Sequence, residues 1–284
     1  MPDQLILLGT KGGPSVRTGG PSPSASLLQA GGRNYVIDCG SGVTRGYVEA
    51  GMHLSQLETI FITHHHSDHV LEFGGLIHSA WVTGLKQAVK AFGPKGLEDH
   101  WKHFQAMMGF DIRTRIVDEG RPDLAGLVTV SDFDETLSYS DGTVTVDALR
   151  VKHPPVTDTF ALRFKVNGKT IVFSADTCYF PPLAEFARGA DILVHEAMFV
   201  PGIDGLLRKL ANAGPALRKH MFASHTPVEE AGKLAALAGV KHLVLNHFVP
   251  GLDNAVTARD YETAVRTTWS GRLSIGTDGM VIEV

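Results

Sequence analysis

Residues 63–69, Thr63-His64-His65-His66-Ser67-Asp68-His69, decide both the fold and the chemistry expected for this chain. They begin at the last residue of LETIFIT, a run rich in β-branched and aromatic residues that predicts a buried strand. Alternate side chains of extended backbone point the same way, so His64 and His66 can converge on one metal ion. Asp68 and His69 lie where the chain turns into a predicted helix, and there they can face a second ion beside the first.

Three further donors of the same kind follow later apolar runs: His153, Asp176 and His247. Ligands of α/β proteins gather where loops leave the ends of strands, so we expect these side chains at the same site. Imidazole and carboxylate donors without a thiolate suit Zn²⁺ or a similar first-row ion. A carboxylate such as Asp176 can bridge two ions, and such a pair activates a shared water to hydroxide at neutral pH. The alternative interpretation is that residues 63–69 form a solvated histidine-rich loop that binds no metal.

Composition and charge exclude several classes of protein. The 284 residues include 26 Lys and Arg against 30 Asp and Glu, a net charge of −4 without the basic excess usual in nucleic-acid-binding proteins. Two cysteines cannot form a disulfide framework or a four-cysteine zinc site. No apolar run approaches the about 20 residues needed to cross a bilayer, and no signal-peptide pattern opens the chain. We therefore expect a cytoplasmic protein with no membrane contact, although a leader removed from the chain would leave no trace.

Both halves of the chain show strands first and then alternating helices and strands, which predicts one α/β domain over 1–284. The pattern over 84–135 is less regular. The segment 81–130 begins with many large apolar residues, and it can be a lid, a dimer interface or core. A basic run at 208–220 is either a solvated face or a region that attracts an anionic substrate.

Six segments in order resemble motifs of the metallo-β-lactamase superfamily: VIDCGSG with Asp38, THHHSDH, FSADT, HEAMF, SHTPVEEAGKLA and LNHFVP. The fourth, fifth and last of these are similar to segments of its ribonuclease Z-like branch. The Gly-rich opening loop and NHFVP are closer to arylsulfatase-like and cyclic-phosphodiesterase-like members. The resemblance implies a four-layer αββα sandwich, the metallo-β-lactamase fold.

The resemblance also implies a division of the donors between two divalent ions, Zn²⁺ first, with Mn²⁺ or Fe²⁺ as alternatives. Two sets of ligands share Asp176 as the bridge: His64, His66 and His153 on one ion, and Asp68, His69 and His247 on the other. Asp68 is also implied as catalytic, together with two residues that bind no metal. His225 would assist the oxyanion or leaving group, and Glu196 would orient it. The alternative for His225 is a cap on the helix that begins near Pro227.

These residues predict a dinuclear hydrolase in which a metal-bound hydroxide cleaves a small anionic or ester substrate, most simply a phosphodiester or aryl sulfate. A lactone or β-lactam comes next, and an iron-dependent redox protein is the alternative of another class. Only 23 residues separate His153 from Asp176. The long arm that tRNA-processing members insert there is therefore missing, and tRNA is not expected as a partner. A homodimer is one option for the assembly.

Overall fold

The computed structural model describes residues 3–210 and 214–284 and contains two seven-stranded sheets. The first sheet consists, in spatial order, of β14 (Val281–Glu283), β1 (Gln4–Gly9), β2 (Ala25–Ala30), β3 (Arg33–Ile37), β4 (Thr59–Phe61), β5 (Val89–Pro94) and β6 (Val128–Phe133). The second consists of β13 (Arg272–Ile275), β12 (His242–Val249), β11 (Ile192–Met198), β10 (Lys169–Phe173), β9 (Phe160–Val166), β8 (Val144–Arg150) and β7 (Ser138–Ser140).

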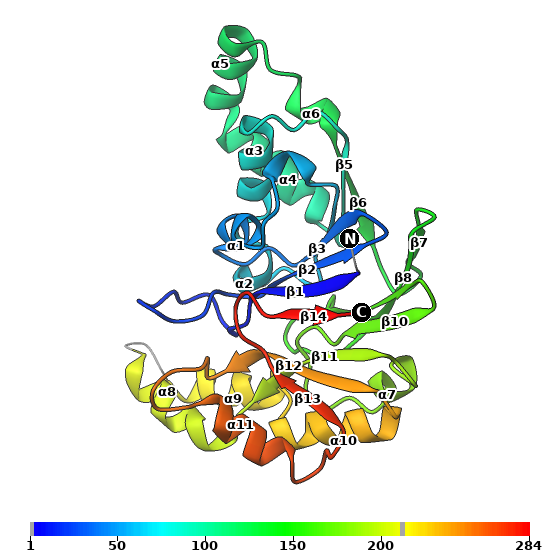
Figure 1. Cartoon of the computed structure of the whole chain (residues 1–284). Helices are drawn as coiled ribbons and strands as arrows, with labels where there is room; N and C mark the ends of the chain where they lie inside the picture. Colours follow the sequence, from blue (N-terminus) through cyan, green and yellow to red (C-terminus); the bar gives the residue numbers. More distant parts are fainter. Residues whose placement is uncertain (1–2, 211–213) are drawn as a thin grey trace.

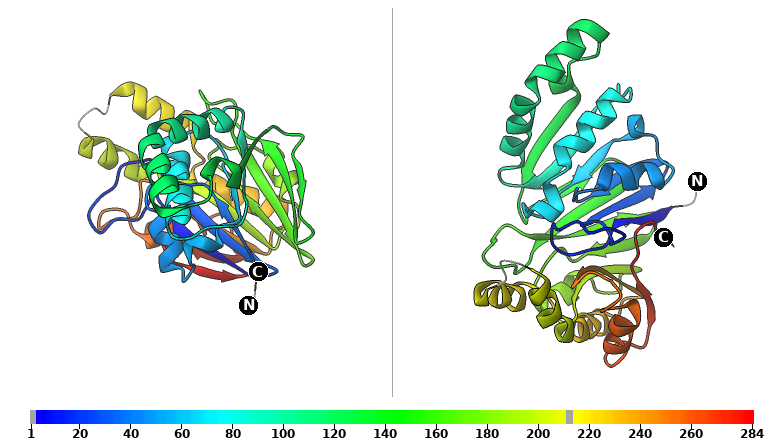
Figure 2. Two further views of the ribbon diagram at one scale, coloured as in Figure 1. Left: turned by 90° about the horizontal axis from the view of Figure 1, so that it is seen from above. Right: turned by 90° about the vertical axis from the view of Figure 1, so that its left-hand side faces the viewer.

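Helices cover the outer face of each sheet, and Figures 1 and 2 show the resulting layers. The helices of the first half are α1 (Val43–Glu49), α2 (Ser67–Val70), α3 (Phe73–Val82), α4 (Leu97–Met107), α5 (Gly109–Glu119) and α6 (Leu124–Leu127), with the 3₁₀ turn η1 (Leu54–Gln56). Those of the second half are α7 (Pro182–Phe186), α8 (Ile203–Lys209), α9 (Pro215–Ser224), α10 (Val228–Ala238) and α11 (Ala258–Val265), with η2 (Val200–Gly202). The expected four-layer αββα sandwich is confirmed.

Three apolar clusters lie between these four layers, and the side-chain alternation of the strands supplies them. In β1, Ile6 and Leu8 pack under the helices of the first half, whereas Leu5 and Leu7 face the other sheet. Full burial of one such side chain stabilises the fold by roughly 1.5–3 kcal/mol. A slip of one residue would exchange the two faces, so the pattern of burial fixes the register.

The topology brings the predicted donor segments together at one end of the sandwich. Strands β3 and β4 are parallel neighbours in the first sheet, and β10, β11 and β12 are parallel neighbours in the second. The carboxyl ends of parallel neighbours lie at the same edge, which is where loops carry ligands. Asp38, Asp176 and the histidine tract follow β3, β10 and β4, and His247 lies near the end of β12.

The stretch 84–135, whose sequence pattern is less regular, contains β5, α4, α5, α6 and β6. Strand β5 ends in Gly-Pro, which hides its alternation, and α5 exposes the apolar side chains of Phe110 and Val117. In the same region Trp101 is buried, whereas Met107 is exposed. The helix predicted to follow the histidine tract is interrupted and forms α2 and α3. Within the described residues, no helix has the length and apolar character of a membrane span.

Candidate metal centre

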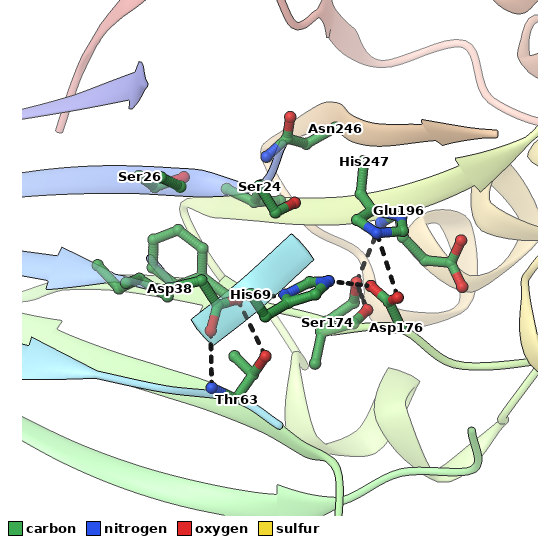
Figure 3. A pocket seen from close by; sticks show the side chains of 15 residues that line it. Ser24, Ser26, Asp38, Thr63, His69, Ser174, Asp176, Glu196, Asn246 and His247 are labelled. Atoms are coloured by element: carbon green, nitrogen blue, oxygen red, sulfur yellow. Dashed lines mark hydrogen bonds and ion pairs between the residues drawn. The ribbon is translucent and has the colours of Figure 1, made fainter. Parts of the chain in front are cut away.

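The loop after β4 is held in place by Asp38, which lies just beyond β3. Its Oδ1 accepts a hydrogen bond from the Thr63 backbone N–H at 2.7 Å, and its Oδ2 accepts one from Thr63 Oγ1 at 2.9 Å. Asp38 Oδ2 also lies 2.8 Å from His69 Nδ1 (Figure 3). A carboxylate on one ring nitrogen fixes the orientation of an imidazole, so Asp38 aims His69 Nε2 at the centre.

The first donor group joins three histidines and one carboxylate whose ligand atoms all lie within 4.8 Å of one another: His64, His66, His153 and Asp176. His66 Nδ1 is 3.2 Å from His64 Nε2 and 2.9 Å from His153 Nε2. Asp176 Oδ2 is 3.8 Å from the Nε2 atoms of His64 and His153. Ligands of a tetrahedral zinc ion lie roughly 3.4 Å apart, so the spacing suits one cation.

The second donor group comprises Asp68, His69, Asp176 and His247, again with ligand atoms within 4.8 Å. His247 Nε2 is 3.1 Å from Asp176 Oδ2 and 3.3 Å from Asp68 Oδ2. His69 Nε2 is 3.4 Å from Asp176 Oδ1. Asp176 belongs to both groups and offers a different oxygen to His69 than to His64. All seven residues predicted as ligands are therefore brought together, in the two sets that the resemblance implies.

Two buried atoms among the seven donor residues indicate whether the two groups can accommodate cations. His69 Nε2 and Asp176 Oδ1 have no hydrogen-bond partner among the described residues. A buried polar atom left unpaired costs about 1–3 kcal/mol, and both atoms belong to residue types that bind first-row metals. The backbone beside the donors is strained as well, because Asp38, Ala175 and His247 have φ of 63°, 53° and 44°. The donor set therefore fits two divalent ions.

Burial sets the protonation of several donors to the form that binds metal. It lowers the pKa of His64 and His66, and it lowers the pKa of His153 to about 4, so these rings are neutral at pH 7. Burial opposes the ionisation of Asp68 and Asp176, but nearby His69 and His247 outweigh it and hold the pKa of both carboxyls below the usual range. Neutral imidazoles and ionised carboxylates are the ligand forms. Burial opposes protonation of His69, but the nearby carboxylates outweigh it and raise the pKa, so His69 would release a proton when a cation binds.

Metal should therefore stabilise the folded chain. Chelator-treated protein is expected to melt at lower temperature than protein in Zn²⁺ at 100 times its dissociation constant, where linkage contributes about 2.7 kcal/mol for each of the two ions. For a chain of this size that corresponds to a shift of roughly 5–10 °C in Tm for each ion, measured by scanning calorimetry. Mg²⁺ is the control, because it prefers all-oxygen ligands and should give no shift. Equal melting with zinc and with chelator would contradict the assignment.

Glu196 and His225 form a pair beside the two donor groups. His225 Nδ1 lies 3.2 and 3.3 Å from the two carboxylate oxygens of Glu196. The backbone N–H groups of Thr177 and Thr226 donate to Glu196 Oε1 and fix the carboxylate. Burial opposes protonation of His225, but Glu196 outweighs it and raises the pKa to about 9. Because Nδ1 is engaged, His225 has only Nε2 to offer a bound molecule. His225 follows Ser224, the last residue of α9, whereas the N-cap of α10 is Pro227. Among the described residues no side-chain hydrogen bond caps α10, so the capping alternative is not borne out.

His220, the last residue of the basic run at 208–220, lies beside the donor groups. Its ring lies 6.0 Å from that of His153 and 6.2 Å from those of His66 and His225. Its Nδ1 is 3.2 Å from Ser224 Oγ, which donates to the Pro154 carbonyl. The sequence signal that could have linked His220 to the site is its separation of five residues from His225, near the end of the same helix.

A pocket of about 410 Å³ opens beside both donor groups. His66, Asp68 and Asp176 of the donor groups line it, and so does His225. The volume lies in the range of about 300–1,000 Å³ usual for small-molecule sites. The arrangement can therefore hold one small substrate against two cations and a histidine.

Known proteins with a similar sequence or a similar fold indicate the class of protein to which this chain belongs. The family described as "Anti-Pycsar protein Apyc1" matches residues 4–244. A protein named "Ribonuclease Z" from Mycobacterium sp. (strain KMS) is 32% identical, over 99% of this chain and 96% of its own. The metallo-β-lactamase-fold protein YhfI from Bacillus subtilis has a TM-score of 0.73 at 24% identity and full coverage of both chains. Zn²⁺-bound PqqB from Methylobacterium extorquens has a TM-score of 0.70 at 15% identity, over 99% and 100%.

Fold, donor groups and relatives together define a metal-dependent hydrolase of ester bonds, in the ribonuclease Z-like branch of the metallo-β-lactamase superfamily. Within that class, the chain belongs to the family described as Anti-Pycsar protein Apyc1. The match to the mycobacterial ribonuclease Z extends over nearly the whole length of both proteins. A protein with that name can therefore be about as short as this chain. The short separation between His153 and Asp176 therefore does not exclude an RNA substrate, contrary to the argument from the missing arm.

Proposed function

We propose that this chain uses two divalent ions, Zn²⁺ first, to hydrolyse a small phosphodiester. The observation that carries the proposal is the shared Asp176, which joins two donor groups beside a pocket sized for a small molecule. The first half of the chain supplies four donors and the second half three, so residues 1–284 act as one hydrolase unit. The zinc in PqqB, which has the same fold, supports zinc as the first choice.

Two cations in these groups would lower the pKa of a bound water and stabilise charge that develops on the ester oxygens. The protein side chains provide position and proton transfer. Asp68 Oδ2 accepts a hydrogen bond of 2.6 Å from the Gly13 backbone N–H, and this bond fixes its carboxylate in the lining of the pocket. Asp68 Oδ1 would accept a hydrogen bond from the attacking water and orient it, because the low pKa of this carboxyl keeps it ionised.

His225 acts on the opposite side of the reaction. Glu196 holds Nδ1, so Nε2 donates a proton to the leaving oxygen of the ester. The ring lines the pocket with 8% of its surface exposed, enough to touch a bound ester while bulk water is kept away. Stacking against His247, with ring centroids 5.6 Å apart, keeps the ring in this position.

A panel of chromogenic esters tests the proposal. We expect bis-p-nitrophenyl phosphate to be hydrolysed with a kcat/KM at least about tenfold above that of p-nitrophenyl sulfate, an aromatic lactone and nitrocefin, with zinc or manganese. Each tenfold step corresponds to about 1.4 kcal/mol of transition-state stabilisation. Preference for the sulfate, the lactone or nitrocefin would replace the phosphodiester with that substrate. Iron at full occupancy with a redox-active absorption spectrum would instead indicate the redox alternative.

Ribonuclease activity is the second candidate, favoured by the 32% identity to a protein named Ribonuclease Z. A radiolabelled precursor tRNA belongs in the same panel. If this RNA is cleaved faster than the small phosphodiester, ribonuclease activity replaces hydrolysis of a small phosphodiester as the favoured function.

A further inference from the structure

The pocket beside the donor groups has one cationic side and one apolar side. Lys11 and Arg17, from the loop between β1 and β2, lie on the cationic side. Leu206, Leu217 and Met221, from α8 and α9, lie on the other. Figure 1 shows this dark-blue loop leaving the body on the same side as α8.

The basic run at 208–220 does not supply the cations of this pocket. Lys209 is paired with Asp253 at 2.7 Å, and Arg218 with Asp204 at 3.2 Å. Of the run's basic residues, only His220 lines the pocket. The cations therefore come from Lys11 and Arg17, at the other end of the sequence.

Lys11 occupies a position built around it. The residue is 6% exposed, and its Nζ donates to the carbonyls of Gly12 at 3.1 Å and Gly13 at 2.6 Å. Gly251 lies so close that a Cβ there would come within 2.8 Å of Lys11 Cγ. The Gly13 N–H in turn donates to Asp68 Oδ2, so one glycine joins the ammonium group to the second donor group.

Among the described residues, no carboxylate lies within ion-pair distance of the Lys11 ammonium group, and Asp68 acts on it only from further away. An ammonium group buried without a close counter-charge is costly. Arg17 has one weak contact, with Asp253 at 3.9 Å, and that carboxylate also holds Lys209. Burial lowers the pKa of Lys11 to about 8, although nearby Asp68 opposes the shift, and Arg17 adds to it. A bound anion would provide the missing counter-charge.

We propose that Lys11 and Arg17 form an anion-binding pair that selects substrates with a negatively charged ester group, while the apolar side receives the organic substituent. This inference rests on the proposed function and deepens it, because it names the substrate class as an anionic phosphoryl ester with an apolar substituent. Arg17 and Lys11 also border a neighbouring cavity of about 180 Å³ formed with Gly251 and Asp253, so the pair lies between two spaces. The ester anion lies at this junction.

Calorimetry of the zinc-loaded protein with inorganic phosphate tests the pair without requiring turnover. Lys11→Met keeps the aliphatic stem and removes the charge, and it should weaken phosphate binding about 10- to 100-fold. Arg17→Met should weaken it about 3- to 10-fold, because Arg17 is the more exposed of the two. Lys11→Arg should restore most of the affinity. Lys95→Met is the matched control, since Lys95 is exposed and lines another pocket, and it should bind phosphate as the wild type does.

Kinetics provide a second readout. Lys11→Met should raise KM for bis-p-nitrophenyl phosphate about tenfold or more, with kcat within about threefold. The loss of kcat/KM should be at least about fivefold smaller for the neutral ester p-nitrophenyl acetate than for the phosphodiester. Inorganic sulfate in the same titration distinguishes a general anion site, with equal affinities, from a phosphoryl site, with phosphate at least about tenfold tighter.

Three results would overturn the inference. If Lys11→Met binds phosphate with unchanged affinity but melts at a lower temperature, Lys11 only stabilises the loop between β1 and β2. Equal losses with the neutral and the anionic ester would exclude selection by charge. Equal affinities for sulfate and phosphate would remove the phosphoryl preference. If the wild type does not hydrolyse the phosphodiester, the proposed function fails, but the phosphate titration still decides the role of the pair.

Discussion

Asp176→Ala is expected to remove both metal ions at once. Asp176 is 2% exposed and is the one carboxylate that belongs to both donor groups. Its Oδ2 lies 3.8 Å from His64 Nε2 and 3.1 Å from His247 Nε2, and its Oδ1 lies 3.4 Å from His69 Nε2. Without it each group keeps only three donors, and the negative charge between the two cations is lost. Repulsion between the ions then opposes double occupancy.

The measurement is metal content by mass spectrometry after dialysis against a weak chelator. The wild type should retain two ions per chain and Asp176→Ala close to none, with hydrolysis reduced by about 10⁴-fold or more. Asp176→Asn keeps the volume and should behave in the same way, which separates charge from packing. Asp191→Asn is the control, since Asp191 precedes β11 and pairs with Lys241 at 2.8 Å. Two retained ions and full activity in Asp176→Ala would end the dinuclear assignment.

The sequence was sufficient to predict the metal donors because their spacing follows from regular structure. His64 and His66 alternate on extended backbone, and Asp176 lies a few residues beyond a parallel strand. Such positions can be read from the chain once the strands are recognised. The division within the histidine tract followed from its spacing, but the assignment of His153, Asp176 and His247 to one ion or the other needed the family resemblance.

Lys11, Arg17 and His220 were not predicted, and the reasons are physical. Lys11 and Arg17 lie in a loop of Gly, Pro and Ser with no periodic pattern, and the loop is placed by contacts with distant segments. The Lys11 backbone, for example, forms a bridge with Phe248, more than 200 residues away. His220 lies on a helix whose single buried turn gives a weak apolar pattern. Sequence patterns report the periodicity of an element, whereas these side chains depend on how irregular segments fold over the sheet ends.

His225→Ala is expected to separate catalysis from metal binding. His225 Nδ1 is hydrogen-bonded to Glu196, and the seven proposed metal ligands, which do not include His225, are sufficient for two ions. The variant should therefore keep both ions, while kcat for a diester with an alkoxide leaving group falls about 10²- to 10⁴-fold, the usual contribution of a positioned general acid. KM should change little, because the ring donates only as the leaving oxygen gains charge. Glu196→Gln should reduce kcat less, since an amide can still orient the ring.

The identity of the leaving group decides between a proton donor and a structural histidine at position 225. A p-nitrophenolate leaves without protonation, so His225→Ala should lose little activity on bis-p-nitrophenyl phosphate and far more on a diester with an alkoxide leaving group. An equal loss on both substrates would make the ring a positioning element. Loss of one ion would move His225 into the first coordination sphere, since Glu196, His225 and His247 also bring three donor atoms within 4.8 Å. His53→Ala is the control, because its ring caps the exposed turn η1.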